Sequence, residues 1–450
     1  MLVRFSVGNF LSFKDIQEFS MIKGKAKKKA ERIFDNEKIK LLKFASVFGA
    51  NASGKSNFVK AINYSRNIIL KGEIDNISAS EFKLDNESKN KPSYFEFEIV
   101  IDDRVYSYGF EISIHNKKFI SEWLIELEAN REVVIFSRDI PNEKSSSDLK
   151  IKDQGSRNSF NLYLNDLESN DEVLFLNEMN SKSKSTLYKK EDELIIFKKI
   201  YEWFLNKIDV NYPERPISNY SYFLENNNQI CKILQSFGTG ITNFKVEDTN
   251  IDAIKGLPGD LVKKIITDLE NIKNSDNEGK KEATITLRTR NAYYMFNLLD
   301  DNETIDVTTI KFNHGSDVLF GFEEESDGTR RLLDLIEILY NAEDKVYIID
   351  ELDRSLHPQL TYKFIQEFLK LANNRNTQLI ITTHEARLLD FELLRQDEIW
   401  ISNKGDLGDT SLYSLDEYNI RFDKKVEKAY LEGRYGGVPI FSSIFPIGEV

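Results

Sequence analysis

The chain has 450 residues, of which 40% are hydrophobic and 30% charged, a balance typical of globular proteins. This length suits two or three domains, or one core with a large insertion. The formal net charge of −13 argues against a broadly basic surface for nucleic acid, although a local basic groove stays open. The single cysteine, Cys231, cannot form an internal disulfide, which indicates a reducing cytosol.

Two further features bear on localisation. The first residues, "MLVRFSVGNFLSF", lack the basic-then-apolar order of a signal peptide. No uninterrupted apolar segment of the sequence approaches the about 20 residues that a membrane helix needs. We therefore expect a cytoplasmic protein that is not embedded in a membrane.

The N-terminal segment, residues 2–22, alternates apolar and polar residues over short runs and predicts a β-hairpin. Residues 23–32, "KGKAKKKAER", follow with six basic residues and one acidic residue. A solvated loop is the first interpretation of this segment, and a loop that contacts DNA or RNA is the alternative.

The next stretch, "VFGANASGKSN" at residues 47–57, fits the pattern G-x-x-x-x-G-K-[ST]. An apolar run precedes it and apolar residues at helical spacing follow it, so a strand, a loop and a helix are expected in that order. Such a loop binds phosphate, because its glycines let backbone N–H groups approach phosphate oxygens, its lysine reaches the outer phosphates and its hydroxyl binds Mg²⁺. The predicted nucleotide-binding residues, of which Ser56 is also a metal ligand, are Gly49, Ala50, Asn51, Ala52, Ser53, Gly54, Lys55, Ser56 and Asn57.

The rest of the chain predicts three regions. Residues 92–139 contain four β-rich runs, and we assign residues 1–140 to the first half of a nucleotide-binding core with a β subdomain. Residues 141–283 have Ser/Asn/Lys-rich boundaries and helical periodicity, and are expected to form a mainly helical insertion. In residues 284–450, strands and helices alternate after residue 310, which indicates an α/β sheet with the nucleotide at the carboxyl ends of its strands.

Two adjacent acids end a predicted buried strand in "VYIIDE". Asp350 is expected to organise Mg²⁺ through its water shell, and Glu351 to orient or deprotonate the attacking water. An ordinary strand that runs into an acidic loop would look the same. The phosphate loop upstream favours the catalytic interpretation.

Two shorter signals accompany the acids. Ser326 and Gly328 in "ESDGTRR" precede a predicted helix, where they either cap it or present a hydroxyl and N–H groups to phosphate. His384 in "ITTHE" ends the strand after the acidic one. His357 either opens a helix ahead of Pro358 or belongs to the site. His115 and His314 show no site pattern.

Five motifs in this order resemble the stand-alone ABC-type ATPases of bacterial defence and abortive-infection operons, which are relatives of SMC, RecF and overcoming-lysogenization-defect proteins. The resemblance is to AAA family ATPases of the RloA or AbiL kind, and the tail "EKAYLEGRYGGVP" is also similar to that group. It covers roughly residues 1–140 and 300–440. One departure is Asp327, which stands where the family's signature has a glycine. The motifs are "VGNFLSFKD", "FGANASGKSN", "ESDGTRRLLDL", "IIDELDRSLHP" and "ITTHE".

The resemblance implies a P-loop NTPase of ABC-ATPase type that hydrolyses ATP with Mg²⁺ as a head-to-tail homodimer or higher homo-oligomer. It implies that His384 contacts the γ-phosphate and that Asp353 lies where the chain crosses to the partner subunit. Ser326 and Gly328 would close over the ATP of the other subunit. A phage-defence role with a partner effector, such as a nuclease, is implied by family membership alone.

Two alternatives stay open from other classes. One is a DNA-repair ATPase that clamps DNA directly, which ATP-dependent DNA binding by the purified chain would distinguish. The other is a non-hydrolysing nucleotide sensor that holds an effector inactive. An intact Glu351 argues against the second alternative.

Overall fold

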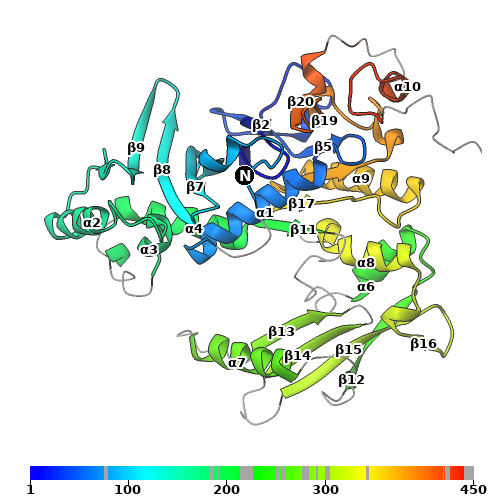
Figure 1. The fold of residues 1–450 in the computed structure, drawn as a ribbon. Coiled ribbons are helices and arrows are strands. Elements are labelled where there is room, and N and C mark those ends of the chain that lie inside the picture. The colour runs from blue at the N-terminus through cyan, green and yellow to red at the C-terminus, as the bar shows by residue number, and fades with distance from the viewer. Residues whose placement is uncertain are drawn as a thin grey trace, which may run out of the picture. The chain divides into compact units, whose positions relative to one another are not determined.

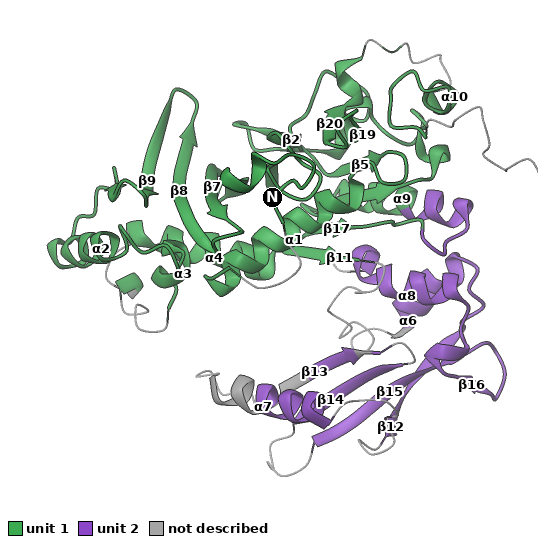
Figure 2. Cartoon of the chain, viewed as in Figure 1, with its two compact units in different colours: residues 1–212, 343–353, 365–450 green, residues 213–342, 354–364 purple. Residues whose placement is uncertain are grey.

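A computed structural model describes residues 1–74, 80–181, 187–189, 192–212, 227–249, 254, 259–275, 283–289, 292–298, 305–340, 344–418, 420 and 426–439. The chain forms two compact units, which Figure 2 distinguishes by colour. The first unit comprises residues 1–212, 343–353 and 365–450, and the second comprises residues 213–342 and 354–364.

The first unit contains a 7-stranded antiparallel sheet in the order β10-β9-β8-β7-β6-β1-β2 (Figure 1). Apolar and polar residues alternate along these strands, so that every second side chain points into the core. In strand β6, for example, buried and half-buried residues alternate. The predicted N-terminal hairpin is confirmed by the antiparallel pairing of β1 with β2. The strands are β1 (Leu2–Gly8), β2 (Gln17–Ser20), β6 (Ser93–Ile101), β7 (Arg104–Ser113), β8 (Lys118–Glu128), β9 (Arg131–Asp139) and β10 (Lys144–Ser146).

A second, 6-stranded sheet in the same unit has the order β11-β17-β18-β5-β19-β20. All neighbours are parallel except β20, which runs antiparallel to β19 at one edge. The central strands are continuous apolar runs, which is typical of parallel strands buried on both faces. The strands are β5 (Phe44–Phe48), β11 (Ile208–Asn211), β17 (Val346–Ile349), β18 (Gln378–Thr383), β19 (Ile399–Lys404) and β20 (Thr410–Ser414). A separate small sheet pairs β3 (Ile33–Asp35) with β4 (Lys40–Leu42).

Helix α1 (Lys55–Lys71) packs with strands from both sheets in one hydrophobic core. Phe58 on this helix contacts Phe5 of the antiparallel sheet at 6.0 Å between ring centroids, and the same core includes Val47 of the parallel sheet. The helix begins after Gly54 and ends at Gly72, whose φ of 78° is the left-handed conformation common at helix C-termini. The predicted strand–loop–helix order is therefore confirmed.

The described residues between 150 and 207 include α-helices that also belong to the first unit, namely α2 (Gln154–Asp166), α3 (Phe175–Met179) and α4 (Ile195–Asn206). Their aromatic side chains pack on the antiparallel sheet, as shown by Phe197 of α4, which stacks on Phe136 of β9. These helices therefore complete the core of the sheet that precedes them in sequence.

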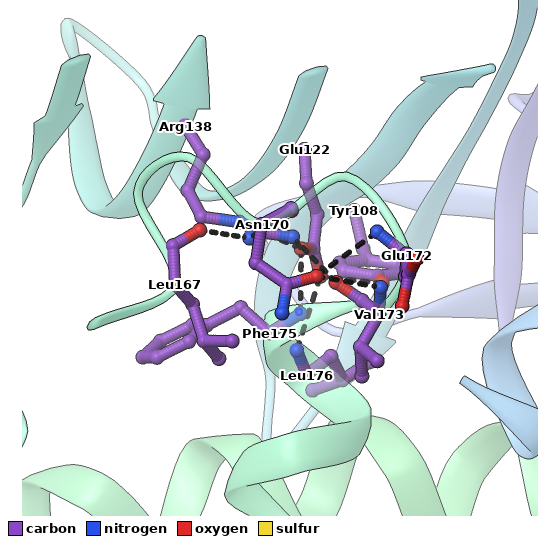
Figure 3. A network of polar contacts seen from close by, with 9 residues as sticks. All are labelled: Tyr108, Glu122, Arg138, Leu167, Asn170, Glu172, Val173, Phe175 and Leu176. Atoms are coloured by element: carbon purple, nitrogen blue, oxygen red, sulfur yellow. Dashed lines mark hydrogen bonds and ion pairs between the residues drawn. The ribbon is translucent and has the colours of Figure 1, made fainter. Parts of the chain in front are cut away.

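A buried ion pair between neighbouring strands β8 and β9 holds the connection from α2 to α3 (Figure 3). Glu122 and Arg138 have fully buried side chains 2.6 Å apart. The guanidinium of Arg138 donates to the carbonyls of Leu167, Asn170 and Val173. Glu122 accepts from the hydroxyl of Tyr108 and from the first two backbone N–H groups of α3. Both charges thus find partners on the segment that they anchor.

The second unit contains a 5-stranded sheet in the order β12-β15-β14-β13, with β16 paired to β15. Its cores include residues of α7 beside β14 and β15, and Tyr293 of β14 donates to Asp334 of α8 at 2.7 Å. Among the helices that the structure describes, none has the length and apolar character needed to cross a bilayer. The elements are α6 (Asn227–Ser236), β12 (Asn243–Thr249), α7 (Gly259–Ser275), β13 (Ala283–Arg288), β14 (Tyr293–Leu298), β15 (Ile305–Asn313), β16 (Leu319–Phe320) and α8 (Asp327–Tyr340).

The compact units divide at other positions than the predicted domain boundaries at 141 and 283. Residues 141–212 belong to the first unit, because α4 packs in its core and β11 pairs in parallel with β17. Residues 284–342 belong to the second unit, because β14 and β15 extend the sheet of β12 and β13. The last helices are α9 (Pro358–Ala372) and α10 (Val426–Leu431).

Candidate active site

Three strand ends meet at one edge of the parallel sheet. Strand β18 lies between β5 and β17, with Phe48 opposite Thr383 and Ile381 opposite Ile349. Because parallel strands point the same way, the residues that follow them gather at one edge. The phosphate loop, Asp350 with Glu351, and His384 are the segments that follow these strands. The structure therefore brings together the predicted loop, acids and histidine.

The two loop glycines stand where no side chain fits. A Cβ on Gly49 would lie 2.5 Å from the carbonyl oxygen of Ser402. A Cβ on Gly54 would lie 2.1 Å from Oγ1 of Thr410, and the φ of Gly54 is 106°. The hydroxyls of Ser402 and Thr410 both donate to the carbonyl of Ser53, at 2.8 Å and 3.0 Å. Strands β19 and β20 thus hold the loop from one side, while Asn51 at its tip is exposed.

Lys55 is buried inside the loop. Its ammonium donates to the carbonyls of Gly49 and Ala50, at 2.8 Å and 2.9 Å. Desolvation lowers the pKa of Lys55 to about 8, and the carboxylates of Asp350 and Glu351 partly oppose that shift. A phosphate anion would offer this ammonium a stronger acceptor than a neutral carbonyl does.

The hydroxyl of Ser56 and the carboxylate of Asp350 lie together, with Ser56 Oγ 3.2 Å from Asp350 Oδ1. Magnesium is commonly held by one or two protein oxygens together with the phosphates of the substrate. This oxygen pair fits Mg²⁺ in that way. Ser53 adds a buried hydroxyl that has no hydrogen-bond partner among the described residues, beside a loop closed to side chains at both glycines. The residues present therefore fit a nucleotide phosphate with its metal.

Thr382 connects the two acidic residues. Its hydroxyl donates to Asp350 Oδ1 at 2.6 Å and accepts from the backbone N–H of Glu351 at 2.8 Å. Glu351 has a φ of 47°, a left-handed conformation that costs a residue with a side chain about 1–3 kcal/mol. We did not identify Thr382 from the sequence. Its position two residues before His384 was the available signal.

His384 is exposed beside the buried lysine and the acids. Desolvation and the nearby charge of Lys55 lower the pKa of His384, while Asp353, Glu351 and Asp350 oppose the shift. A lowered pKa favours the neutral imidazole at pH 7. Asp353 has a buried Oδ1 without a hydrogen-bond partner among the described residues.

Asn57 contacts the N-terminal hairpin loop. Its amide donates to Ser12 Oγ at 2.8 Å, and the hydroxyls of Ser12 and Thr410 are hydrogen-bonded to each other at 2.7 Å. Ser12 therefore ties the start of α1 to strand β20. A direct contact of Asn57 with nucleotide stays a prediction, and Ser12 and Thr410 are site residues that carried no motif.

Ser326 and Gly328 lie in the second unit, at the start of α8. Ser326 Oγ accepts from the backbone N–H of Thr329 at 3.1 Å, so it caps the helix. A Cβ on Gly328 would lie 3.2 Å from the carbonyl of Ser355. A contact with nucleotide stays a prediction for both residues.

The remaining histidines have structural contacts. The carbonyl of His357 accepts from Leu360 and Thr361 in the first turn of α9, as expected of a residue that opens a helix. The ring of His314 contacts Glu325 at 2.7 Å. The structure thus supports the helix-opening interpretation of His357.

Solved structures with similarity to this chain include three SMC heads. One is the SMC head bound to the C-terminal winged-helix domain of ScpA, with 13% identity, a TM-score of 0.37, and coverage of 92% of this chain and 97% of that one. The SMC head domain of Thermotoga maritima gives 12% identity, a TM-score of 0.34 and coverages of 92% and 98%. The third is an SMC head with an extended coiled coil, bound to the C-terminal domain of ScpA derived from Pyrococcus furiosus. It gives 13% identity, a TM-score of 0.36 and coverages of 92% and 97%.

The search of curated proteins found no match. A family model described as "AAA domain, putative AbiEii toxin, Type IV TA system" matches residues 44–390. That range contains the phosphate loop, both acids and His384. The chain has a mixed α/β fold with a large antiparallel sheet. It belongs to this AAA-domain family.

Proposed function

We propose that this chain binds and hydrolyses ATP and thereby works as a nucleotide-dependent switch. One observation carries the proposal: Lys55 and Ser56 of the phosphate loop lie beside Asp350, at the edge where three parallel strands end. A buried cation, a hydroxyl and a carboxylate so arranged suit a triphosphate with its metal.

The chain's own groups divide the chemistry between them. Backbone N–H groups of the loop and the ammonium of Lys55 would hold the phosphates, while Ser56 and Asp350 would hold Mg²⁺. The metal would neutralise charge that develops on the phosphate oxygens. Glu351 would take a proton from the attacking water. Its position after β17 is fixed by the hydrogen bond from its backbone N–H to Thr382. The neutral ring of His384 would meet the γ-phosphate.

We further propose a head-to-tail dimer in which Ser326 and Gly328 close over the nucleotide of the other subunit. The helix start that they form offers N–H groups and a hydroxyl to phosphate. Asp353 would lie at the same interface. ATP binding would assemble the dimer and hydrolysis would release it, which is a population shift driven by differential affinity.

The proposed setting is bacterial phage defence, with this ATPase as the sensor or regulator and a nuclease-like protein as the effector. The support is the resemblance to ATPases of the RloA or AbiL kind and the family's description, "AAA domain, putative AbiEii toxin, Type IV TA system". Co-purification of the chain with the product of a neighbouring gene would test this assignment.

Direct DNA binding is the second candidate, and the basic segment 23–32 favours it. Lys29 donates to the carbonyl of Phe391, and Arg32 donates to that of Leu393, so the segment is fixed on the protein. Lys25 and Lys27 are exposed on it. ATP-dependent binding of DNA by the purified chain, lost in Lys25→Glu/Lys27→Glu, would support this candidate.

Turnover measurements test the central proposal. Lys55→Ala should lose ATP binding, because the outer phosphates lose the loop's cation. Glu351→Gln should bind ATP but lose about 10² to 10⁴ in turnover, because an amide cannot accept the proton. Glu385→Gln is the control, since among the described residues that carboxylate caps the 3-10 helix 386–388 through the N–H of Arg387. Near-normal turnover in Glu351→Gln would contradict its assignment as the base, and a wild type that binds ATP without turnover would support the sensor alternative.

A further inference from the structure

The C-terminal tail is fixed on strands β19 and β20 of the first unit. Tyr430 lies in helix α10, and its hydroxyl donates to the carbonyl of Gly437, beyond the helix, at 2.8 Å. The hydroxyl of Tyr413 on β20 donates to the carbonyl of Tyr435 at 2.6 Å. The N–H of Gly437 donates to Asn403 Oδ1 on β19 at 3.0 Å. The tail is therefore a folded part of the first unit.

This tail reaches the phosphate loop. A Cβ on Gly437 would lie 3.5 Å from the Cα of Gly49, so the two backbones are close neighbours. The ring of Tyr430 packs edge-on against Phe48, the residue before Gly49, at 6.1 Å between centroids. A Cβ on Gly49 would instead point toward Ser402 of β19. The first glycine of the loop thus lies between strand β19 and the tail.

Two tail glycines are required by this close approach. Gly436 and Gly437 have φ values of 69° and 65°, in the left-handed region that disfavours other residues. A Cβ on Gly436 would lie 2.4 Å from the hydroxyl oxygen of Tyr413, and one on Gly437 would lie 2.6 Å from Cγ2 of Ile401. Any side chain at these positions would push the tail away from β19 and from the loop.

We propose that Tyr430 and residues 435–437 are a positioning element of the nucleotide site, which holds the first turn of the phosphate loop in its binding conformation. The proposal rests on the proposed function, because it assigns the tail to ATP binding. The ammonium of Lys55 donates to the carbonyls of Gly49 and Ala50, and bound phosphates would replace these carbonyls as its acceptors. The conformation of Gly49 therefore enters the free energy of nucleotide binding.

Thermodynamic linkage makes the coupling reciprocal. If the docked tail strengthens ATP binding, then bound ATP must stabilise the docked tail by the same free energy. The tail thus differs from a purely structural segment in a measurable way. Its docking should respond to nucleotide.

The first experiment compares Gly437→Ala with Gly433→Ala in the full chain, using a fluorescent ATP analogue with Mg²⁺. A Cβ on Gly437 would lie 2.6 Å from Cγ2 of Ile401, and this clash should displace the tail and raise the dissociation constant by about tenfold. Gly433 has a comparable φ of 79°, but among the described residues its Cβ would contact Val438 alone, at 3.3 Å. Gly433→Ala should therefore bind the analogue within about twofold of the wild type. In turnover, Gly437→Ala should raise KM with little change in kcat.

The second experiment needs no variant and covers a Gly437→Ala chain that does not fold. Hydrogen exchange of the wild type is followed with and without Mg²⁺-ATP, and amides of residues 429–437 should become more protected with ATP. Unchanged tail exchange under saturating ATP, or a folded Gly437→Ala chain with wild-type affinity, overturns the inference. A wild type that binds no ATP would instead overturn the proposed function.

Discussion

A single hydroxyl, that of Thr382, fixes both acids of the candidate site. It donates to Asp350 and accepts from the N–H of Glu351, which has a left-handed φ of 47°. A strained residue persists only where its surroundings hold it. The hydrogen bond from the N–H of Glu351 to Thr382 on strand β18 holds Glu351 in this conformation. Thr382 should therefore affect catalysis without contacting the nucleotide.

We expect Thr382→Val to lower ATP turnover by about 10- to 100-fold, as is common for residues that orient metal ligands. Valine keeps the shape of threonine but removes the hydroxyl that positions Asp350 and Glu351. Affinity for the ATP analogue without Mg²⁺ should change little, because Lys55 and its loop are untouched. Thr382→Ser, which restores the hydroxyl, should recover most of the turnover. Equal activity of the valine variant and the wild type would contradict this role.

The lowered pKa of Lys55 predicts a pH dependence of ATP binding. Burial holds this pKa at about 8, so the free protein loses the ammonium as the pH rises through 8. Bound phosphates favour the charged form, and affinity should therefore be full below pH 8 and weaken above it. Dissociation constants measured from pH 7 to 9.5 would check this. Lys55→Arg keeps its charge across the range and should lack the decline.

At the scale of elements, the Glu122–Arg138 pair illustrates what sequence patterns do not reveal. The four β-rich runs within residues 92–139 predicted strands β6 to β9 correctly, because alternation is a local signal. The same alternation gives no sign that two charged side chains on β8 and β9 are fully buried. Their partners are backbone groups of residues 167–176, which lie far along the chain. Burial of this pair depends on tertiary contacts.

We expect Glu122→Gln to destabilise the first unit by about 3–5 kcal/mol, because the guanidinium of Arg138 stays buried without its counter-charge. The measurement is the urea midpoint followed by tryptophan fluorescence, since Trp123 is the next residue on β8. Glu128→Gln is the matched control on the same two strands. Glu128 pairs with Arg131 at the same 2.6 Å distance, but in an exposed setting, and its loss should shift the midpoint far less than the loss of Glu122 does. A similar loss of stability in both variants would contradict the prediction that burial makes the Glu122 pair more important for stability.

The candidate site shows the same division between local and distant information. The glycine, lysine, acid and histidine motifs were visible because each stands at the end of a predicted strand. Ser12, Thr410 and Gly437 join the phosphate loop from both ends of the chain, and the hydroxyls of Ser12 and Thr410 are hydrogen-bonded across 398 residues of sequence. Such contacts require the strand order β18-β5-β19-β20, which periodicity does not encode.

At the scale of the whole molecule, the proposed switch requires Ser326 to act on the ATP of a partner subunit. Within its own unit this residue already has a role, since Ser326 Oγ caps α8 through the N–H of Thr329. Removing the cap alone typically costs about 1 kcal/mol. Ser326→Ala therefore measures the cap, and Ser326→Arg adds bulk and charge at the proposed interface.

We expect Ser326→Arg to bind ATP like the wild type, because Lys55 and the phosphate loop are unchanged, but to lose ATP-driven dimerisation and most turnover. Ser326→Ala should keep a larger share of both. The decisive measurement mixes Ser326→Arg with Lys55→Ala, neither of which should be active alone. A mixed dimer contains one composite site with an intact loop from the first chain and an intact Ser326 from the second. Some ATP-driven dimerisation and turnover should return.

Light scattering with Mg²⁺-ATP separates the remaining outcomes. Dimerisation without turnover in the mixture would mean that the two composite sites hydrolyse only together, which leaves the trans assignment intact. Absence of both in the mixture, together with absence of turnover in a fused chain that links the two variants, would contradict the assignment. Ser326 would then serve α8 alone, as its hydrogen bond to Thr329 already allows. The linker removes weak association as an explanation, because it raises the effective concentration of the partner to the millimolar range.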